Sequence, residues 1–334
     1  MSSKIGVIIQ ARTDSTRFPK KVLELIEGKP LLWHVIQRCK GINERVIVAT
    51  TKRKIDCPIV EIAKECNVDY YQGAKDDVLD RYYKTAKKFE LDIIIRITAD
   101  CPLIDPKKSI KVIKPIQSKK FDYAGLHTFP EGLSTEGFSF KSLEKAWKNA
   151  KLQSQREHVT PYLYDPENKF RKISIYGKKE FNDHRWVVDY PDDLEFVRKI
   201  YSELYKGEIF YMNNVIKLLK EKPEITKLCL PHLRYEGYFK TIKDEGYTHI
   251  SKNDLKRIDY AVDFIEKISG GKDFSFIDSK FQQIFHGPIF ACYFIKFKKM
   301  SMQNAIKHLS SKYKIKNFTK NEENVVKLYS KFFH

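Results

Sequence analysis

The sequence lacks any apolar run approaching the roughly 18 residues that a membrane-spanning helix needs. It also lacks the basic segment and apolar core of an export signal near its start, because a strand-like run begins already at Ile5. The spacing of its six cysteines matches no metal site, and without an export signal we expect free thiols. We therefore expect a cytoplasmic protein without a membrane span.

Charge of one sign is in excess: 62 lysines and arginines against 43 acidic residues give a net charge of +19. The basic residues are spread along the chain among acidic ones, and no basic–aromatic RNA-binding pattern occurs, which argues against nucleic acid as a partner. A positive field also suits an enzyme that binds a nucleotide triphosphate. With 334 residues, two domains are expected.

The amino-terminal segment organises the rest of the chain. Residues 5–9 are apolar and mostly β-branched, which predicts a buried strand, and a polar loop follows with Arg12, Arg17 and Lys21. A loop at the carboxyl end of a parallel strand is where open α/β sheets bind ligands, and guanidinium groups suit a polyphosphate. No P-loop motif occurs, and composition alone leaves a solvated basic loop as the alternative.

The following segments alternate between helix and strand. We predict a helix from residue 30, a strand at 45–51 ending in Thr50 and Thr51, a helix at 58–66 and a strand at 68–71. This rhythm predicts an α/β fold with a doubly wound, mostly parallel sheet.

Two carboxylates follow later predicted strands. Asp100 lies just after a buried strand that ends in Thr98, and Asp189 ends a predicted strand at 186–188. Carboxylates in such positions suit a hard cation such as Mg²⁺. Asp105 is expected to cap a helix, and a further strand is predicted at 121–125, then helical structure at 196–222.

Three motifs resemble those of a known family. They are Gln-Ala-Arg-x-x-Ser-Thr-Arg-x-Pro-x-Lys-Val-Leu from residue 10, Thr-Ala-Asp-Cys-Pro-Leu-Ile-Asp from residue 98, and Arg-Glu-His-Val-Thr-Pro-Tyr from residue 156. Residues of about 4–225 resemble the CTP-dependent cytidylyltransferases that make CMP-sugars, in the branch of the spore-coat polysaccharide proteins. The resemblance implies a Rossmann-like nucleotidyltransferase that transfers CMP from CTP to an acidic sugar acceptor, releases pyrophosphate, serves surface polysaccharide synthesis and forms a homodimer.

The resemblance also implies roles for particular residues. Catalysis is assigned to Arg12 and Lys21, and Mg²⁺ binding to Asp100 and Asp189. The nucleotide is expected to contact Gln10, Ala11, Arg12, Ser15, Lys21, Thr50, Asp80, Arg81 and Thr98. The acceptor is expected to contact Glu136, Arg156 and His158. Structural roles stay open for four of these: Asp80 in an ordinary acidic first helical turn, Glu136 in the fold, and both Arg156 and His158 in a structural network with Glu157.

Three positions depart from the family pattern, and one of them, Ala99 in place of the usual glycine, differs only by a methyl group. Asp14 stands where relatives have a small residue, and a carboxylate beside a triphosphate is unfavourable unless it faces away. Lys20 replaces a common glycine, which limits the backbone angles available there.

Residues 232–334 are expected to form a second domain after a cytidylyltransferase domain at 1–231. Predicted elements are helices at 252–269, 288–298 and 301–311 and a strand at 274–277. The segment faintly resembles the end of a dual-specificity phosphatase, with Asp278 and Ile284 where the nucleophilic cysteine and the arginine would stand. Such a domain would be an inactive accessory; an unrelated small domain is the alternative.

Two other functions remain as alternatives. One is a glycosyltransferase of similar sheet topology that uses a nucleotide sugar, and the other is a non-catalytic nucleotide-binding scaffold.

Overall fold

The computed structural model describes residues 3–178, 180–181, 184–229, 236–245 and 302–312, together with 258, 262, 291–293, 296, 300, 322–323, 325–327 and 329. The chain divides into two compact units, one of residues 1–151 and 155–230 and the other of 152–154 and 231–334. Among the described helices, none has the length and apolar character needed to cross a membrane.

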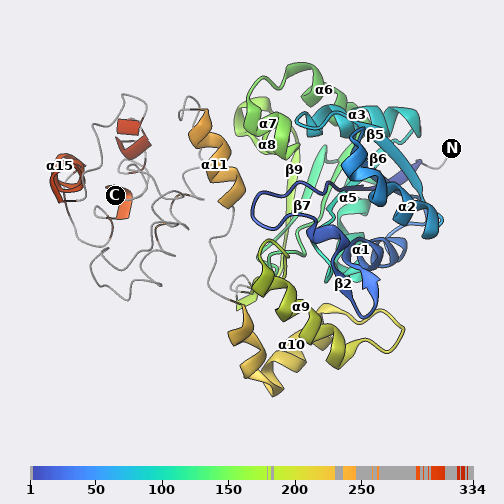
Figure 1. The fold of residues 1–334 in the computed structure, drawn as a ribbon. Helices are drawn as coiled ribbons and strands as arrows, with labels where there is room; N and C mark the ends of the chain where they lie inside the picture. The colour runs from blue at the N-terminus through green and yellow to red at the C-terminus, as the bar shows by residue number, and fades with distance from the viewer. Residues whose placement is uncertain are drawn as a thin grey trace. The chain divides into compact units, whose positions relative to one another are not determined.

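A seven-stranded sheet forms the centre of the first unit (Figure 1). In spatial order its strands are β5 (Asp69–Gly73), β4 (Val46–Thr51), β1 (Ile5–Gln10), β6 (Ile93–Thr98), β8 (Glu136–Ser139), β7 (Tyr123–His127) and β9 (Lys172–Tyr176). Only β8 runs antiparallel to its neighbours, β6 and β7. The mostly parallel, doubly wound sheet predicted from the sequence is thereby confirmed.

Helices cover both faces of this sheet. One hydrophobic core includes side chains of α1 (Leu31–Lys40), α2 (Cys57–Glu65), α5 (Ile113–Gln117), α9 (Pro191–Leu204) and α10 (Met212–Glu221). The other includes side chains of α3 (Val78–Lys88), α6 (Phe140–Asn149) and α8 (Pro161–Tyr164). Because side chains alternate along a strand, β1 sends Val7 and Ile9 into the first core and Ile8 into the second.

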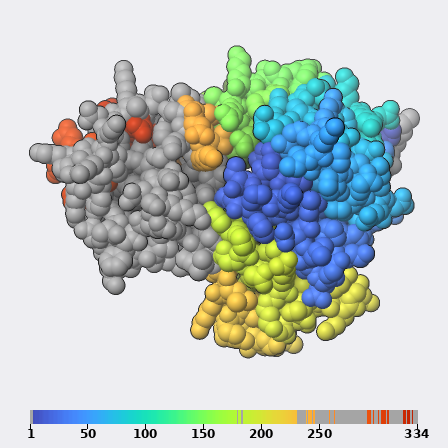
Figure 2. All heavy atoms as spheres, in the orientation of Figure 1, coloured from blue at the N-terminus to red at the C-terminus, as the bar shows by residue number. Residues whose placement is uncertain are grey.

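Shorter elements complete the unit, except that the first two residues of α7 (Gln153–His158) are grouped with the second unit. These elements are the hairpin β2 (Leu25–Ile26) and β3 (Lys29–Pro30), the helices α4 (Pro106–Ser109) and α7, and the 3₁₀ turns η1 (Lys21–Leu23), η2 (Lys54–Asp56), η3 (Ile110–Val112), η4 (Pro166–Asn168) and η6 (Pro223–Leu228). In the space-filling view, the yellow-green segment that contains α9 lies against the blue amino-terminal segment (Figure 2). Arg198 of α9 donates to the Leu25 carbonyl at 2.9 Å.

Three expectations are corrected. Residues 186–188 form no strand: both edges of β6 are already paired with β1 and β8, so the chain crosses the carboxyl end of β6 instead. The helical stretch at 196–222 is divided between α9 and α10, separated by a loop in which Gly207 has φ +86°. The motif at 156–158 ends α7 rather than opening a helix.

The second unit contains α11 (Glu236–Asp244) and α15 (Met302–Lys312). The helix predicted at 301–311 is confirmed by α15. The elements predicted at 252–269, 274–277 and 288–298 fall where the structure describes at most a few residues, and Asp278 and Ile284 lie outside the described residues.

Candidate active site

The carboxyl ends of the parallel strands bring polar residues together. Gln10 at the end of β1 is in register with Thr98 at the end of β6, and Thr50 lies near the end of the neighbouring β4. Thr50 is fully buried, whereas Gln10 and Thr98 are half-buried. Since this is the edge at which open α/β sheets bind ligands, these three side chains mark one wall of the candidate site.

The loop after β1 folds back on itself before η1. The Lys20 amide donates to the Thr13 carbonyl at 2.7 Å, and Lys20 adopts the left-handed conformation with φ 60°. Glycine has no steric penalty there, so the lysine at this position costs stability, as a rough figure 1 kcal/mol. The Ala11 amide is already bonded to the Ala49 carbonyl at 3.1 Å, which extends the β1–β4 pairing and leaves this amide unavailable to a phosphate.

Lys21 joins the loop to both predicted metal ligands. Its Nζ lies 2.7 Å from Asp100 Oδ2 and 2.7 Å from Asp189 Oδ1. The Lys21 side chain is only 8% exposed, so this ammonium group is held away from solvent between two carboxylates. Residues separated by 79 and 168 positions in the sequence therefore meet in one ion cluster.

The charges in this cluster stabilise one another. Burial alone would raise the pKa of Asp100, but the Lys21 ammonium outweighs burial and holds that pKa below its ordinary value. Burial would also raise the pKa of Asp189, yet Lys21, Arg17 and Arg185 lower it strongly. The pKa of Lys21 is raised, because the attraction of both carboxylates exceeds the desolvation of its ammonium. All three groups are therefore charged at neutral pH.

The segment before α9 fixes Asp189 beside Asp100. The Val188 amide donates to the Asp100 carbonyl at 2.9 Å. The Asp193 carboxylate accepts from the amides of Asp189 and Tyr190 at 2.8 and 2.9 Å, so it completes the capping box at the start of α9. The backbone contacts explain how a loop, without strand pairing, places this carboxylate.

The divalent cation implied by family resemblance can be tested against these donors. Carboxylate oxygens are the ligands that Mg²⁺ prefers, and Asp100 and Asp189 direct theirs to one point, where the Lys21 ammonium now lies. The pair therefore fits a hard cation, provided that Lys21 moves aside. A second group, Asp192, Asp193 and Cys229, is close enough to hold an ion, but Asp193 is occupied by Arg185 and by its capping bonds.

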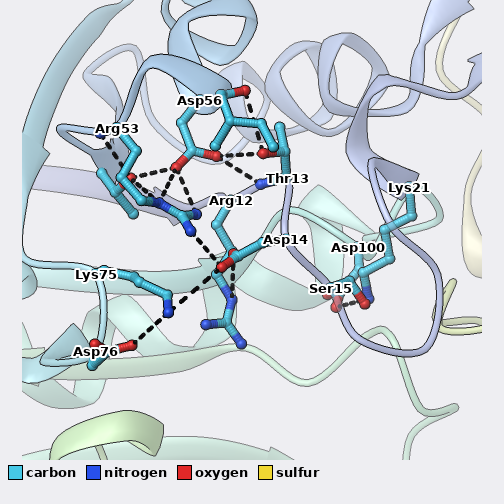
Figure 3. Close-up of polar contacts among 12 residues, drawn as sticks. Arg12, Thr13, Asp14, Ser15, Lys21, Arg53, Asp56, Lys75, Asp76 and Asp100 are labelled. Carbon is cyan, nitrogen blue, oxygen red and sulfur yellow. Dashed lines mark hydrogen bonds and ion pairs between the residues drawn. The ribbon is translucent and has the colours of Figure 1, made fainter.

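Arg12 and Ser15 occupy the loop on the strand side of Lys21. Figure 3 shows Ser15, Lys21 and Asp100 gathered on one side of the loop and Arg12 beside Asp14 on the other. The Arg12 side chain is 39% exposed, and its Nε lies 3.6 Å from Asp14 Oδ1. Arg12 is therefore accessible to an anion, and its contact with a triphosphate stays a prediction.

Several polar atoms at this edge are buried without a hydrogen-bond partner among the described residues. They are Gln10 Oε1, Thr50 Oγ1, Asp14 Oδ1 and Arg81 Nε. Leaving a buried polar atom unsatisfied costs about 1–3 kcal/mol, so such atoms are uncommon unless a ligand completes them. Their concentration at the predicted nucleotide site favours a ligand with several polar groups.

The two residues predicted from the helix α3 have different environments. Arg81 is buried, and its Nη1 donates to the carbonyls of Ala74 and Lys75 at 2.5 and 3.3 Å, which fixes the loop before α3. Asp80 accepts from Trp147 Nε1 at 2.9 Å and pairs with Lys84 at 2.8 Å. These contacts occupy the Asp80 carboxylate with the packing of α3 on α6.

The contacts of the predicted acceptor residues do not bring them together, because Glu136 and Arg156 bind different partners. Glu136 on β8 faces Arg96 on β6, which donates to it at 2.6 Å, and Tyr123 donates to its other oxygen at 2.5 Å. Arg156 binds the carboxylate of Asp77, the residue that caps α3, through Nε at 3.0 Å and through Nη2. His158 is half-buried at the end of α7.

Sequence reasoning missed a network behind the loop. Asp56 is fully buried and accepts from the Thr13 amide at 2.8 Å, the Thr13 hydroxyl at 2.7 Å, Thr51, and Arg53 Nη2 at 2.9 Å (Figure 3). Burial would raise the pKa of Asp56, but these donors lower it overall. An aspartate five residues beyond a strand that ends in Thr-Thr was the available signal.

A mostly parallel sheet with a basic loop after β1 and paired carboxylates at its carboxyl edge defines a Rossmann-like nucleotidyltransferase. The family model for cytidylyltransferases matches residues 6–222, and the chain belongs to this family.

The chain is also similar to individual proteins of known sequence or structure. The chain is 25% identical to the spore coat polysaccharide biosynthesis protein SpsF of Bacillus subtilis, over 65% of this chain and 94% of that protein. It is 30% identical to a 3-deoxy-manno-octulosonate cytidylyltransferase of Bartonella henselae, over 58% of this chain and 82% of that protein. A solved cytidylyltransferase from Leptospira borgpetersenii has a TM-score of 0.64 at 31% identity, covering 67% of this chain and 96% of its own.

Proposed function

We propose that this protein is a Mg²⁺-dependent cytidylyltransferase that transfers CMP from CTP to an acidic sugar and releases pyrophosphate, for polysaccharide synthesis. The observation that carries the proposal is the cluster of Lys21, Asp100 and Asp189 beside the loop after β1. Membership in the cytidylyltransferase family supports CMP transfer. The similarity to SpsF and to the 3-deoxy-manno-octulosonate enzyme supports a sugar acid used in a surface polysaccharide.

Positioning and charge compensation carry most of the catalysis in phosphoryl transfer, and the residues present supply both. Arg12 and Lys21 donate to the phosphates and offset the charge that develops on the leaving pyrophosphate. Asp100 and Asp189 would hold Mg²⁺. When bound, this ion would act as a Lewis acid that polarises the reacting phosphate.

The nucleoside is assigned to the partnerless polar atoms at the sheet edge. Gln10 and Thr50 each have a buried oxygen that a donor on the nucleoside can satisfy, and Arg81 has a buried Nε–H that can donate to an acceptor. Thr98 lies in register with Gln10 on the other side. Arg156 and Asp80 are assigned to the support of α3. Of the residues predicted to contact the acceptor, His158 therefore keeps that assignment.

Pyrophosphate release from each of four nucleoside triphosphates, screened against a panel of acidic sugars, tests the proposal. We expect release only with CTP, and a loss of at least ~100-fold in rate for Asp100→Asn. The matched control is Asp92→Asn, the same change at the exposed amino end of the same strand. Sugar transfer from a preformed nucleotide sugar would instead support a glycosyltransferase, and full activity of Asp100→Asn would refute this site.

Family resemblance also supports a homodimer. We further propose a cytoplasmic location and an accessory, non-catalytic domain at 232–334, as expected from the sequence. Sedimentation equilibrium of the full chain tests the dimer: a single species at the mass of one chain, 39.4 kDa, would refute it.

A further inference from the structure

Three cationic side chains from three different loops surround Asp14. Arg12 follows β1, Arg53 follows β4 and Lys75 follows β5. The Asp14 carboxylate lies 2.6 Å from Arg53 Nη1, 3.6 Å from Arg12 Nε and 3.9 Å from Lys75 Nζ (Figure 3). The three loops leave adjacent parallel strands at the edge where the nucleotide is assigned, so an anion site lies next to the loop after β1.

Arg53 is held rigidly in this arrangement. Its Nη2 donates to the fully buried Asp56 at 2.9 Å, and its Nε donates to the Thr51 hydroxyl at 3.2 Å. These contacts orient the guanidinium so that Nη1 is directed at Asp14. A guanidinium fixed by a buried carboxylate presents its remaining donors at low entropic cost, as phosphate-binding arginines do.

Asp14 fills this anion site incompletely. Its Oδ2 is bound by Arg53, but its Oδ1 is buried without a hydrogen-bond partner among the described residues. Arg53 also pairs with Asp56, and Lys75 with Asp76, whereas Asp14 is the one carboxylate within salt-bridge distance of Arg12 among the described residues. Arg12 and Lys75 lie near Asp14 without donating a hydrogen bond to it, so both keep donors for a larger anion. The hydrogen bond from Arg53 also lowers the pKa of Asp14, so the side chain remains an anion at neutral pH.

We propose that Arg12, Arg53 and Lys75 form a binding site for the two phosphates that leave as pyrophosphate, and that Asp14 occupies this site as an internal anion until the nucleotide displaces it. The inference rests on the proposed function, since it assigns part of the CTP-binding site. It also gives Asp14 a role in product release, because the returning carboxylate compensates the three cations as pyrophosphate departs.

Electrostatics sets the size of the expected effect. A charge about 6 Å from one phosphate charge in a solvated site changes binding by a factor of about three, and pyrophosphate carries at least two such charges. Removal of the Asp14 charge should therefore tighten pyrophosphate binding by roughly tenfold. Neutralisation of Lys75 should weaken it by a similar factor, and neither change should affect CMP, which lacks these phosphates.

Calorimetric binding of inorganic pyrophosphate, CTP and CMP to the full-length protein tests the proposal. The variants are Asp14→Asn, which keeps the shape and an acceptor for Arg53, and Lys75→Met. The matched control is Asp76→Asn, which removes an equal charge from a residue that also pairs with Lys75, at 3.4 Å, but is 83% exposed. We expect tighter binding of pyrophosphate and CTP for Asp14→Asn, weaker binding for Lys75→Met, and less than a twofold change for Asp76→Asn.

Unchanged or weaker pyrophosphate binding by Asp14→Asn would overturn the proposal, and weaker binding would identify Asp14 as a support for Arg12. Equal binding of CMP and CTP by the wild-type protein would also overturn it. These results leave the proposed function standing, because pyrophosphate release from CTP is measured separately. Failure of the wild-type protein to bind CTP at all would instead refute the proposed function.

Discussion

Replacement of Lys21 by methionine gives the most direct test of the ion cluster. Methionine keeps most of the side-chain volume but removes the ammonium group, which leaves Asp100 and Asp189 facing each other. Among the described residues, Asp100 has no other cationic partner within salt-bridge distance, whereas Asp189 keeps Arg17 and Arg185. Removal of one partner of a buried ion pair costs about 3–5 kcal/mol. Because Asp189 retains two partners, we expect the lower value, about 3 kcal/mol.

Urea unfolding followed by tryptophan fluorescence measures this loss. All three tryptophans, Trp33, Trp147 and Trp186, belong to the first unit, so their emission reports the unfolding of that unit. A matched control is Lys64→Met, because Lys64 pairs with Glu61 on the surface and exposed ion pairs contribute little to stability. Equal midpoints for Lys21→Met and Lys64→Met would refute a stabilising role for the cluster.

The pH dependence gives a second readout of the same variant. In the wild-type protein the pKa of Asp100 is lowered, so its contribution to stability is present above the unfolded pKa of about 4 and is lost as pH falls through the folded value. Without Lys21, burial and Asp189 raise this pKa, so Lys21→Met should become less destabilised as pH falls from 7 to 5. Adding Asp100→Asn to Lys21→Met should recover roughly 1–3 kcal/mol; no recovery would contradict the argument.

Three further outcomes are expected from single changes. Gly132→Ala should lower the free energy of unfolding by about 2 kcal/mol or more, because Gly132 has φ +100° and an added Cβ would lie 2.7 Å from the Trp186 carbonyl. Gly28→Ala is the control for backbone strain alone, because Gly28 has φ +73° but open space around its Cβ position. Burial lowers the pKa of His34 to about 4, so the wild-type protein should lose up to roughly 3 kcal/mol of unfolding free energy as pH falls from 6.5 to 4. In His34→Gln this contribution to the pH dependence, measured by urea unfolding at each pH, should be absent. Arg156→Gln should raise the KM for the nucleotide and leave the KM for the acceptor unchanged in steady-state assays, since Arg156 supports α3; the opposite split would restore its predicted acceptor role.

Local sequence patterns were sufficient for the central strands and for the two metal-ligand candidates. Strands such as β1 and β4 are short β-branched runs bounded by polar residues, and a carboxylate directly after a buried strand must lie at the edge of the sheet. Asp100 is therefore placed by its own strand. Asp189 was predicted at the same edge for a partly wrong reason, because the chain reaches it through a loop bonded to the Asp100 carbonyl rather than through a strand.

Contacts between distant segments account for what the sequence did not predict. The buried bonds from Thr13 to Asp56 span 43 positions, and neither residue type indicates the other. The antiparallel insertion of β8 between β6 and β7 sets Glu136 opposite Arg96, so a glutamate that looked available for a sugar is fully paired. Hydrophobic periodicity encodes which face of an element is buried, but it carries no information on pairings of this kind.

The protein holds one internal substitute for the proposed Mg²⁺ ion and another for the proposed pyrophosphate group. Lys21 lies between the two carboxylates that would bind Mg²⁺, and Asp14 lies among the three cations that would bind phosphates. Without Lys21, two largely buried carboxylates would face each other at a cost of about 3 kcal/mol, and without Asp14 three partly exposed cations would repel one another more weakly. A site built in this way exchanges internal ion pairs for ligand ion pairs, so its affinity for the nucleotide is lower than the contacts alone would give. The same exchange predicts that Asp14→Asn binds CTP more tightly but folds less stably than the wild-type protein, because Arg12, Arg53 and Lys75 then repel one another when no ligand is present.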